Sequence, residues 1–245
     1  MRSLGVDVGG SGIKAALVDT EEGDFIGERV RVDTPRPATP AAVVRVVREI
    51  AEGLGHEGPV GIGVPAPVVG GITTLAANID PAWVGAPAER MFGEAFGRPV
   101  ALINDADAAG VAESAFGAAR DVPGVVLLLT LGTGIGSALI HDGRVVPNTE
   151  LGHIQVRGRD AEHRAAAAVR EARGLTWTEW AGHLSEVLRV YDALFWPDLI
   201  LLGGGVSRKA GKFMHLLDVR APVRAATLEN RAGIIGAATV AATRA

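Results

Sequence analysis

An amide and two carboxylates stand together where an apolar run of the sequence ends. The run VALI (100–103) is followed directly by Asn104, Asp105 and then Asp107. Ligands of α/β proteins bind beyond the carboxyl ends of strands, and a carboxylate placed there can accept the proton of a substrate hydroxyl. Asn104 can use both halves of its amide on neighbouring hydroxyls. Asp107, just before a run of alanines, is expected to cap a following helix, and this is the alternative role for Asp105.

Two glycine-rich segments, one in each half of the chain, share one design. DVGGSGIK (7–14) and LGTGIGSA (131–138) each lie between two apolar stretches. Glycines let backbone N–H groups point toward one concave site, which binds phosphate oxygens; the alternative is a plain glycine hairpin. Two such turns predict a clamp for a chain of phosphates, built from Gly9, Gly10, Ser11, Gly12 and Lys14 on one side and Gly132, Thr133, Gly134 and Gly136 on the other.

A third glycine segment, LLGGGVSRKAG (201–211), predicts a strand, a turn at Gly204 and Gly205, and a helix start where anions can approach. Cations cluster after it, at Arg208, Lys209 and Lys212. With Lys14 they form a candidate basic track, which Arg157, Arg159 and Arg164 would extend. Asp7, at the end of the first strand, is a candidate to hold Mg²⁺ through water.

The pattern of apolar residues predicts the elements that position these residues. Strands are expected at 4–10, 13–19, 25–34, 60–68, 100–104, 124–146 (two strands) and 198–203. Helices are expected at 40–52, 87–96 and 107–116, twice within 161–194 (the second at 176–194), and at the C-terminus. Since the strand–glycine turn–strand design occurs twice, the chain is expected to form two related α/β lobes.

Composition limits the possible functions. The chain has 245 residues, no cysteine and a formal net charge of −4. Absence of cysteine excludes disulfides and thiolate metal sites and fits a cytoplasmic setting. The net charge does not attract nucleic acid, so no such partner is expected. No apolar run approaches the ~20 residues that span a membrane, and the N-terminus does not resemble a signal peptide.

Together these motifs resemble the superfamily of sugar kinases and actin, and within it the ROK (repressor, open reading frame, kinase) family over nearly the whole chain. Segments NIDPAW, NTELGH, TWTEWAGHL, WPDLILLGGGVS and KFMHLLD resemble the polyphosphate glucokinase branch. The resemblance implies a two-lobed actin/hexokinase-like (ribonuclease H-like) α/β fold with a central cleft. The expected domains are a small one at 1–109, joined by a C-terminal helix at about 230–245, and a larger one at 110–229.

The resemblance also implies an activity: phosphorylation of the 6-hydroxyl of glucose, with polyphosphate and possibly ATP as donor and Mg²⁺ as cofactor. Asp105 would be the general base, and the sugar would be held by Asn78, Asn104, Asp105, Glu150 and His153. Asp80 and Trp83 would shape the loop that carries Asn78. Many ROK kinases carry a zinc site with three cysteines; without cysteine, this chain is expected to lack it. A homodimer is the state that the family implies.

Two alternatives remain open from the sequence. The first is an ATP-only ROK hexokinase for glucose or another hexose. The second is a non-catalytic, sugar-sensing ROK protein, which the intact base and glycine loops disfavour. A DNA-binding repressor would need a helix-turn-helix ahead of the first strand, which is expected to begin near residue 4 and leaves no room for one.

Overall fold

The computed structural model describes residues 1–76 and 79–245 and divides into two compact units. The first comprises Met1–Ala112 and Arg231–Ala245, and the second comprises Glu113–Asn230. These bounds give 127 residues (112 and 15 from the two segments) against 118. The boundaries expected from the sequence, 109/110 and about 229/230, lie within three residues of these bounds. None of the helices in the described part of the chain has the length and apolar character of a membrane span.

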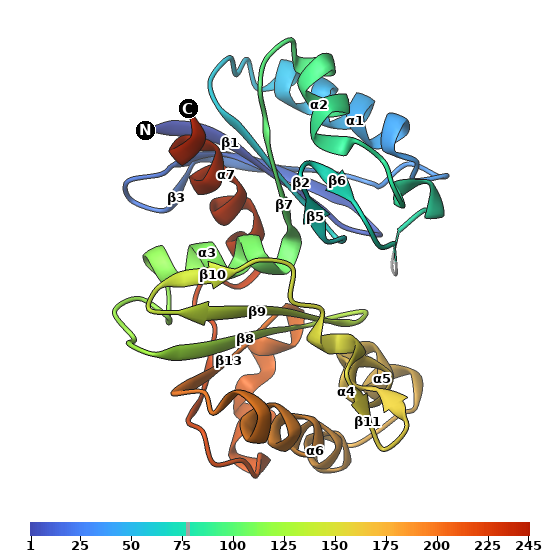
Figure 1. Cartoon of the computed structure of the whole chain (residues 1–245), viewed down its shortest axis with the longest axis vertical. Coiled ribbons are helices and arrows are strands. Elements are labelled where there is room, and N and C mark those ends of the chain that lie inside the picture. The colour runs from blue at the N-terminus through green and yellow to red at the C-terminus, as the bar shows by residue number, and fades with distance from the viewer. Residues whose placement is uncertain (77–78) are drawn as a thin grey trace. The chain divides into compact units, whose positions relative to one another are not determined.

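The first unit is built on a five-stranded sheet in the order β3-β2-β1-β4-β7 (Figure 1). β1, β2 and β3 are antiparallel neighbours, whereas β4 and β7 run parallel to β1. Alternation of apolar and polar residues around the first glycine turn produces the β1–β2 hairpin, as the sequence predicts. The strands are β1 (Arg2–Val8), β2 (Ile13–Asp19), β3 (Asp24–Val32), β4 (Val60–Val64), β7 (Ala101–Asn104) and a small hairpin of β5 (Val68–Val69) and β6 (Ile72–Thr73).

Helices of the first unit are α1 (Pro40–Gly53), α2 (Ala88–Phe96), α3 (Asp105–Phe116) and α7 (Ala232–Arg244), with a 3₁₀ turn η1 (Pro81–Trp83). α7 packs closely on β1 and β4. A Cβ at Gly61 of β4 would lie 1.8 Å from the carbonyl oxygen of Ala237, so only glycine allows this approach. The C-terminal helix thereby supports the sheet whose strand ends carry Asp7 and Asn104.

The second unit repeats this topology. Its sheet has the order β10-β9-β8-β13-β14, again with three antiparallel strands followed by two strands parallel to the central one. The prediction of two related units from the repeated glycine hairpin is confirmed. The strands are β8 (Val125–Leu131), β9 (Ile135–His141), β10 (Arg144–Val146), β11 (Gln155–Val156), β12 (Arg159–Asp160), β13 (Leu199–Gly203) and β14 (Val223–Ala225).

Helical segments of the second unit differ from expectation at two places. The first helix expected within 161–194 is split, because Ala166 is extended (φ −58°, ψ 151°); the two pieces are α4 (Ala161–Ala165) and α5 (Ala167–Ala172). The second expected helix is α6 (Trp177–Phe195), and Thr176 and Glu179 form a capping box at its N-terminus. After the glycine triplet the chain forms a 3₁₀ helix, η3 (Gly205–Lys212), with a kink at Lys209, rather than the expected α-helix. Further 3₁₀ turns are η2 (Leu151–His153), η4 (Met214–Leu216) and η5 (Glu229–Arg231).

Candidate active site

At the end of β7, the helix α3 begins one residue after the strand. The side-chain oxygen of Asn104 accepts hydrogen bonds from the backbone N–H groups of Ala106 (2.9 Å) and Asp107 (3.1 Å). Asn104 is therefore the cap, and the expectation that Asp107 caps the helix is wrong: Asp107 lies inside the first turn and is 2% exposed. The cap thus uses the side-chain carbonyl of Asn104, and the residue is 5% exposed.

Asp105 is the first residue of α3 and is half-buried. Its Oδ1 accepts a hydrogen bond from the backbone N–H of Ala106 at 2.8 Å. The carboxylate therefore lies at the N-terminal end of a helix, whose dipole favours nearby negative charge. The structure thus places Asp105 at the carboxyl end of a parallel strand, next to Asn104, as the sequence predicts.

The first glycine turn, residues 9–12, is closed by its own backbone. The N–H of Gly9 donates to the carbonyl of Gly12 (3.0 Å), and the Thr34 hydroxyl donates to the carbonyl of Gly9 (2.5 Å). Phosphate contacts would therefore come from other amides of the turn, with Gly10 and Ser11 exposed at its tip. None of the glycines at 9, 10 and 12 has a positive φ, so the turn needs glycine for its small size and not for a left-handed backbone conformation.

Charged side chains line up across three strands beside this turn. Asp7, Lys14 and Arg31 are direct cross-strand neighbours on β1, β2 and β3, so they share one face of the sheet. Lys14 Nζ lies 2.9 Å from Asp7 Oδ2, and both side chains are partly buried. The predicted phosphate-binding lysine is thereby held in place by the predicted metal-binding carboxylate.

Arg31 is a basic residue at this turn that the sequence reasoning missed. Its Nη2 donates to the carbonyl of Ser11 (3.3 Å), and its Nη1 lies 3.0 Å from Asp33 Oδ1. A Cβ at Gly12 would come within 3.0 Å of the guanidinium, so glycine makes room for it. Predicting that Arg31 lies at this turn would have required the register of β3 against β2, which pairs Arg31 with Lys14.

Asp7 is the one predicted metal ligand. Mg²⁺ in phosphoryl-transfer sites takes one or two carboxylates and obtains its other ligands from phosphates and water. A single partly buried carboxylate beside a lysine fits that donor set, provided that the phosphate chain supplies the remaining oxygens. Among the described residues, no group of three or more His, Asp or Glu side chains is arranged to hold a metal ion by protein ligands alone.

In the second unit, the second and third glycine segments come together. β8 and β13 are parallel neighbours, with Thr130 opposite Gly203, so both turns follow at the same edge of the sheet. Gly204 has φ 79°, and a Cβ there would lie 2.5 Å from the carbonyl oxygen of Leu131. The N–H of Gly132 donates to the carbonyl of Gly134 (3.0 Å), closing this turn as the first one is closed. Thr133 and Gly205 are exposed at this edge, and Gly134 and Gly136 are half-buried.

Glu150 and His153 lie at the two ends of one 3₁₀ turn, η2, and come together as predicted. His153 Nε2 is 3.9 Å from Glu150 Oε2, while His153 Nδ1 is 3.2 Å from Asp160 Oδ2. Asp160, which the sequence reasoning missed, thus orients the imidazole from β12. The exposed fractions of the Glu150 and His153 side chains are 33% and 32%. Both groups can therefore reach a small polar ligand.

The turn that carries this pair is fixed to the rest of the second unit. The N–H of Leu151 donates to the Ser137 hydroxyl (3.0 Å), and the Tyr191 hydroxyl donates to the Leu151 carbonyl (2.7 Å). A Cβ at Gly152 would lie 2.2 Å from the carbonyl oxygen of Ile135, so the turn packs directly on the first residue of β9. This explains the glycine between Glu150 and His153.

Burial raises the pKa of Glu150, and the negative charge of Glu162 acts in the same direction, whereas His153 lowers it. The first of these causes is the largest. A carboxylate with a raised pKa is a stronger hydrogen-bond acceptor toward a sugar hydroxyl. The pair of Glu150 and His153 therefore offers an acceptor and a ring nitrogen side by side.

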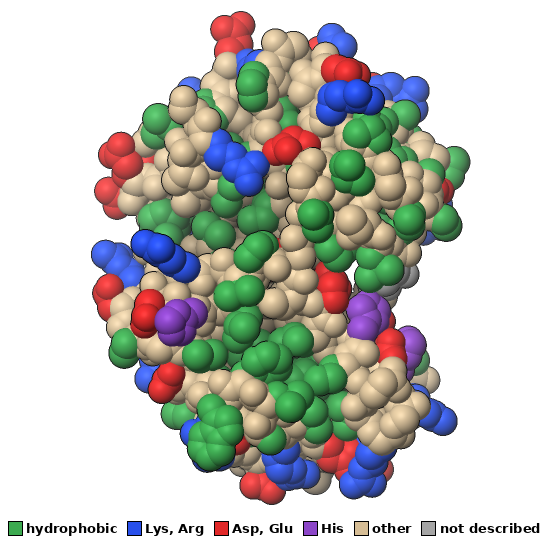
Figure 2. All heavy atoms as spheres, viewed as in Figure 1, with side chains coloured by type: hydrophobic (Ala, Val, Ile, Leu, Met, Phe, Trp, Pro, Cys, Tyr) green, Lys and Arg blue, Asp and Glu red, His purple; other side chains and the backbone are tan. Residues whose placement is uncertain are grey.

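The basic residues predicted to form a track differ in their partners. Arg157 and Arg164 both pair with Glu186, Arg157 at 2.8 Å, so one carboxylate offsets part of their combined charge. Arg208, Lys209 and Lys212 are exposed on η3. Figure 2 shows Lys and Arg side chains interspersed with Asp and Glu on the visible face of each unit.

Asn78 lies outside the described residues. Near it, Asp80 caps η1 through the N–H of Ala82 (2.9 Å). Trp83 is fully buried, and its Nε1 donates to the carbonyl of Ala38 (2.8 Å).

Two sheets of matching topology, each with a glycine hairpin on its central strands, define an α/β protein of the actin/hexokinase-like sugar kinase fold. The ROK family model matches residues 3–173, and the chain belongs to this family. It is 49% identical to the polyphosphate glucokinase of Mycobacterium tuberculosis (strain CDC 1551 / Oshkosh), over 96% of this chain and 89% of that protein.

Two crystal structures are similar over almost the whole chain. The inorganic polyphosphate/ATP-glucomannokinase from Arthrobacter sp. strain KM superposes with a TM-score of 0.96 at 43% identity, covering 100% of this chain and 99% of that one. The ROK family glucokinase from Streptomyces griseus, in complex with glucose and AMPPNP, has a TM-score of 0.84 at 27% identity, covering 99% and 100%.

Proposed function

We propose that this protein is a glucokinase that transfers a phosphoryl group from inorganic polyphosphate, and also from ATP, to the 6-hydroxyl of glucose. The proposal rests mainly on the similarity to a polyphosphate glucokinase over 96% of the chain. The name of that relative identifies polyphosphate as the donor and glucose as the acceptor. The local geometry of Asp105, the glycine turns and the Glu150–His153 pair supports the reaction class.

In this reaction, the carboxylate of Asp105 accepts the proton of the glucose 6-hydroxyl as its oxygen forms a bond to the terminal phosphorus. The bond between that phosphorus and the bridging oxygen breaks, and the shortened polyphosphate or ADP leaves with the electron pair. A hydroxyl is a poor nucleophile, and a positioned base of this kind contributes typically 10²–10⁴-fold. Asn104 would bind a neighbouring hydroxyl through its NH₂ group.

Residues of each unit are proposed to contact phosphates of the donor. Lys14 and the amides of residues 10–12 would contact phosphates in the first unit, and the turns at 132–136 and 204–205 would do so in the second, with Lys209 and Lys212 beyond them. Mg²⁺, held by Asp7 and phosphate oxygens, would neutralise the charge that develops on the leaving group. Positioning and charge neutralisation would then account for most of the catalysis.

Glu150 and His153 are proposed to bind sugar hydroxyls. The Asp160 contact at His153 Nδ1 leaves Nε2 facing Glu150, so one hydroxyl can contact both groups. Asn78 is proposed as a further sugar ligand on the grounds of the family resemblance.

A homodimer in the cytoplasm is also part of the proposal. The family resemblance supports the dimer, and the absence of cysteine supports the compartment. Light scattering on purified protein tests the first, and fractionation of the source cells tests the second.

A donor and acceptor panel tests the proposed function. Polyphosphate, ATP and GTP are each supplied with glucose, mannose or N-acetylglucosamine, and the sugar phosphate is detected by ³¹P NMR. We expect glucose 6-phosphate from polyphosphate and from ATP, and mannose as a second acceptor because a similar enzyme is a glucomannokinase. Product from ATP alone would instead identify an ATP-only hexokinase, and glucose binding without product a sugar sensor.

A further inference from the structure

Arg170 lies over the ring of Trp177 in the second unit, outside the residues discussed so far. Its guanidinium carbon is 3.7 Å from the centroid of the indole ring. Arg170 is half-buried on α5, and Trp177 is the first residue of α6. The carbonyl of Arg170 accepts a hydrogen bond from the N–H of Leu175 (3.0 Å), so a tight turn between the helices fixes this stack.

A second cation lies near the same ring. Lys212, the last residue of η3, has its Nζ 6.0 Å from the Trp177 centroid and is exposed. The neighbouring Phe213 is fully buried, and its ring is stacked with Trp177, with centroids 5.8 Å apart and an angle of 14° between the planes. Cations from two different segments thus lie near one aromatic platform.

Both segments are connected to the glycine turns proposed to bind the donor. The N–H of Ala168, two residues before Arg170, donates to the carbonyl of Gly132 (3.0 Å). η3, which ends at Lys212, begins at Gly205 in the third glycine segment. Arg170 and Lys212 therefore lie on segments that are joined to these turns within the same unit.

The charges of Arg170 and Lys212 are not offset by carboxylates. Arg157 and Arg164 pair with Glu186, whereas neither Arg170 nor Lys212 has an ion-pair partner within residues 1–76 and 79–245. Arg170 also occupies a face of Trp177 on which a nucleobase would otherwise stack. The platform in this form suits a polyanion better than an adenine ring.

We propose that Arg170 and Lys212 bind the distal phosphates of inorganic polyphosphate, those beyond the phosphoryl group that is transferred, and so favour long-chain polyphosphate over ATP. This inference rests on the proposed glucokinase function. It makes Arg170 a specificity-determining residue for the donor, with Trp177 positioning it.

Steady-state kinetics of Arg170→Ala on the full chain test this inference, with long-chain polyphosphate, tripolyphosphate and ATP as donors and glucose in excess. We expect KM for the long chain to rise by roughly 10–150-fold, the size of a lost charge-assisted contact. The salt dependence of log(kcat/KM) should flatten by about 0.7–0.9 for each lost phosphate contact. KM for ATP should change by less than about twofold, as for an untouched surface charge.

Arg173→Ala is the matched control, because Arg173 is an exposed arginine three residues further along, at the end of α5. It should leave all three donors unchanged. Arg170→Lys should retain part of the preference, because the charge remains. If Arg170→Ala folds poorly, Lys212→Ala, at an exposed position, tests the same preference and should shift it in the same direction.

Two outcomes would overturn the inference: wild-type kinetics with long-chain polyphosphate in Arg170→Ala, or an equal loss with all three donors, which indicates a structural role. Neither outcome affects the proposed function. That function fails on a different result, the absence of polyphosphate-dependent glucose phosphorylation by the wild-type protein.

Discussion

The two glycine hairpins share a topology and differ in what surrounds them. In the first, Asp7, Lys14 and Arg31 form a row of charges across three strands. The corresponding row of the second hairpin pairs Thr130 with Gly136 and carries no charge.

The third strand also differs. β3 extends along β2 to the turn, ending with Val32 opposite Ile13, whereas β10 ends at Val146, opposite Leu139. The chain after β10 is then free to form the turn that carries Glu150 and His153. The first hairpin therefore has charged side chains beside its turn. In the second hairpin the third strand is shorter, and the chain after it forms the turn that carries Glu150 and His153.

Among the variants that compare the two hairpins, the largest effect is expected at the charged row. Lys14→Ala should lower kcat/KM with polyphosphate by roughly 10²–10³, because it removes a fixed charge at the donor. Thr133→Ala, in the uncharged turn, should cost within about tenfold, as for one neutral hydrogen bond. Both variants are compared by initial rates, with thermal unfolding to verify the fold. A larger loss at Thr133 would contradict the difference drawn between the hairpins.

Gly152→Ala should break the turn that replaces the strand extension. A Cβ there would lie 2.2 Å from the Ile135 carbonyl oxygen, so the backbone must move. Overpacking of this kind costs about 1–3 kcal/mol, or roughly 2–12 °C in Tm for a chain of this length. Gly182→Ala in α6, where a Cβ meets nothing within 4 Å, is the control and should raise stability slightly. Equal Tm values for Gly152→Ala and wild type would show that the turn does not pack on β9 as described.

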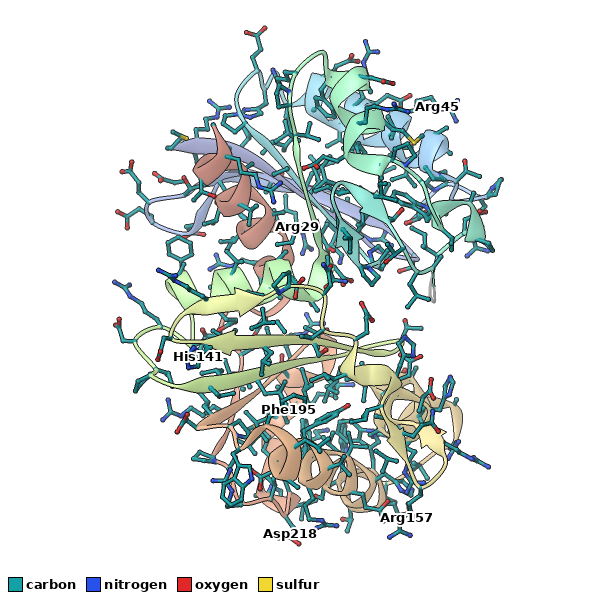
Figure 3. All side chains as sticks on the ribbon, in the orientation of Figure 1. Arg29, Arg45, His141, Arg157, Phe195 and Asp218 are labelled. Carbon is teal, nitrogen blue, oxygen red and sulfur yellow. The ribbon has the colours of Figure 1, made fainter. Side chains whose placement is uncertain are left out.

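Arg31→Ala tests whether the third charge of the row beside the first turn also contacts the donor. We expect KM for polyphosphate to rise about 3–10-fold, with a flatter salt dependence, because one exposed cation beside the turn is lost. Arg45→Ala, on the surface of α1 (Figure 3), removes the same charge away from the turn and should leave KM unchanged. If both variants behave alike, Arg31 does not contact the donor.

The smallest expected effect is on stability at Glu150. Burial raises its pKa, so the charged form is less favourable in the fold than in the unfolded chain, and wild type carries this penalty above the raised pKa. Glu150→Gln should therefore raise Tm at neutral pH, by about 1–2 °C. The difference should shrink as the pH falls through the raised pKa, where Glu150 takes up a proton. A lower Tm for the variant at neutral pH would contradict this sign.

Local patterns in the sequence were enough to predict both glycine hairpins, the strand end at Asn104 and the repeated topology. The Glu150–His153 pair also follows from spacing, since residues three apart meet on one turn. Asp107 was wrongly expected to cap α3, because the helix begins at Asp105, directly after the strand, and Asn104 accepts from its first backbone N–H groups. The split between α4 and α5 at Ala166 depends on the burial of Trp180. The indole N–H of Trp180 donates hydrogen bonds to the carbonyls of Ala165 and Ala166.

Residues brought in by register or tertiary packing could not be predicted. Arg31 reaches the first turn only through the pairing of β3 with β2, and Asp160 reaches His153 from the β11–β12 hairpin. Arg170 meets Trp177 because the chain turns sharply between α5 and α6. No periodicity marks such contacts, since each depends on where a distant segment packs.

Asp105→Asn tests the central claim most directly, because it keeps the shape of the side chain and removes the base. Glucose affinity is measured by calorimetry and turnover by coupled assay, with Asp121→Asn, at a highly exposed loop position, as control. We predict glucose binding within a few-fold of wild type and a fall in turnover of roughly 10²–10⁴. Near-normal turnover in Asp105→Asn would contradict the assignment of this carboxylate as the base.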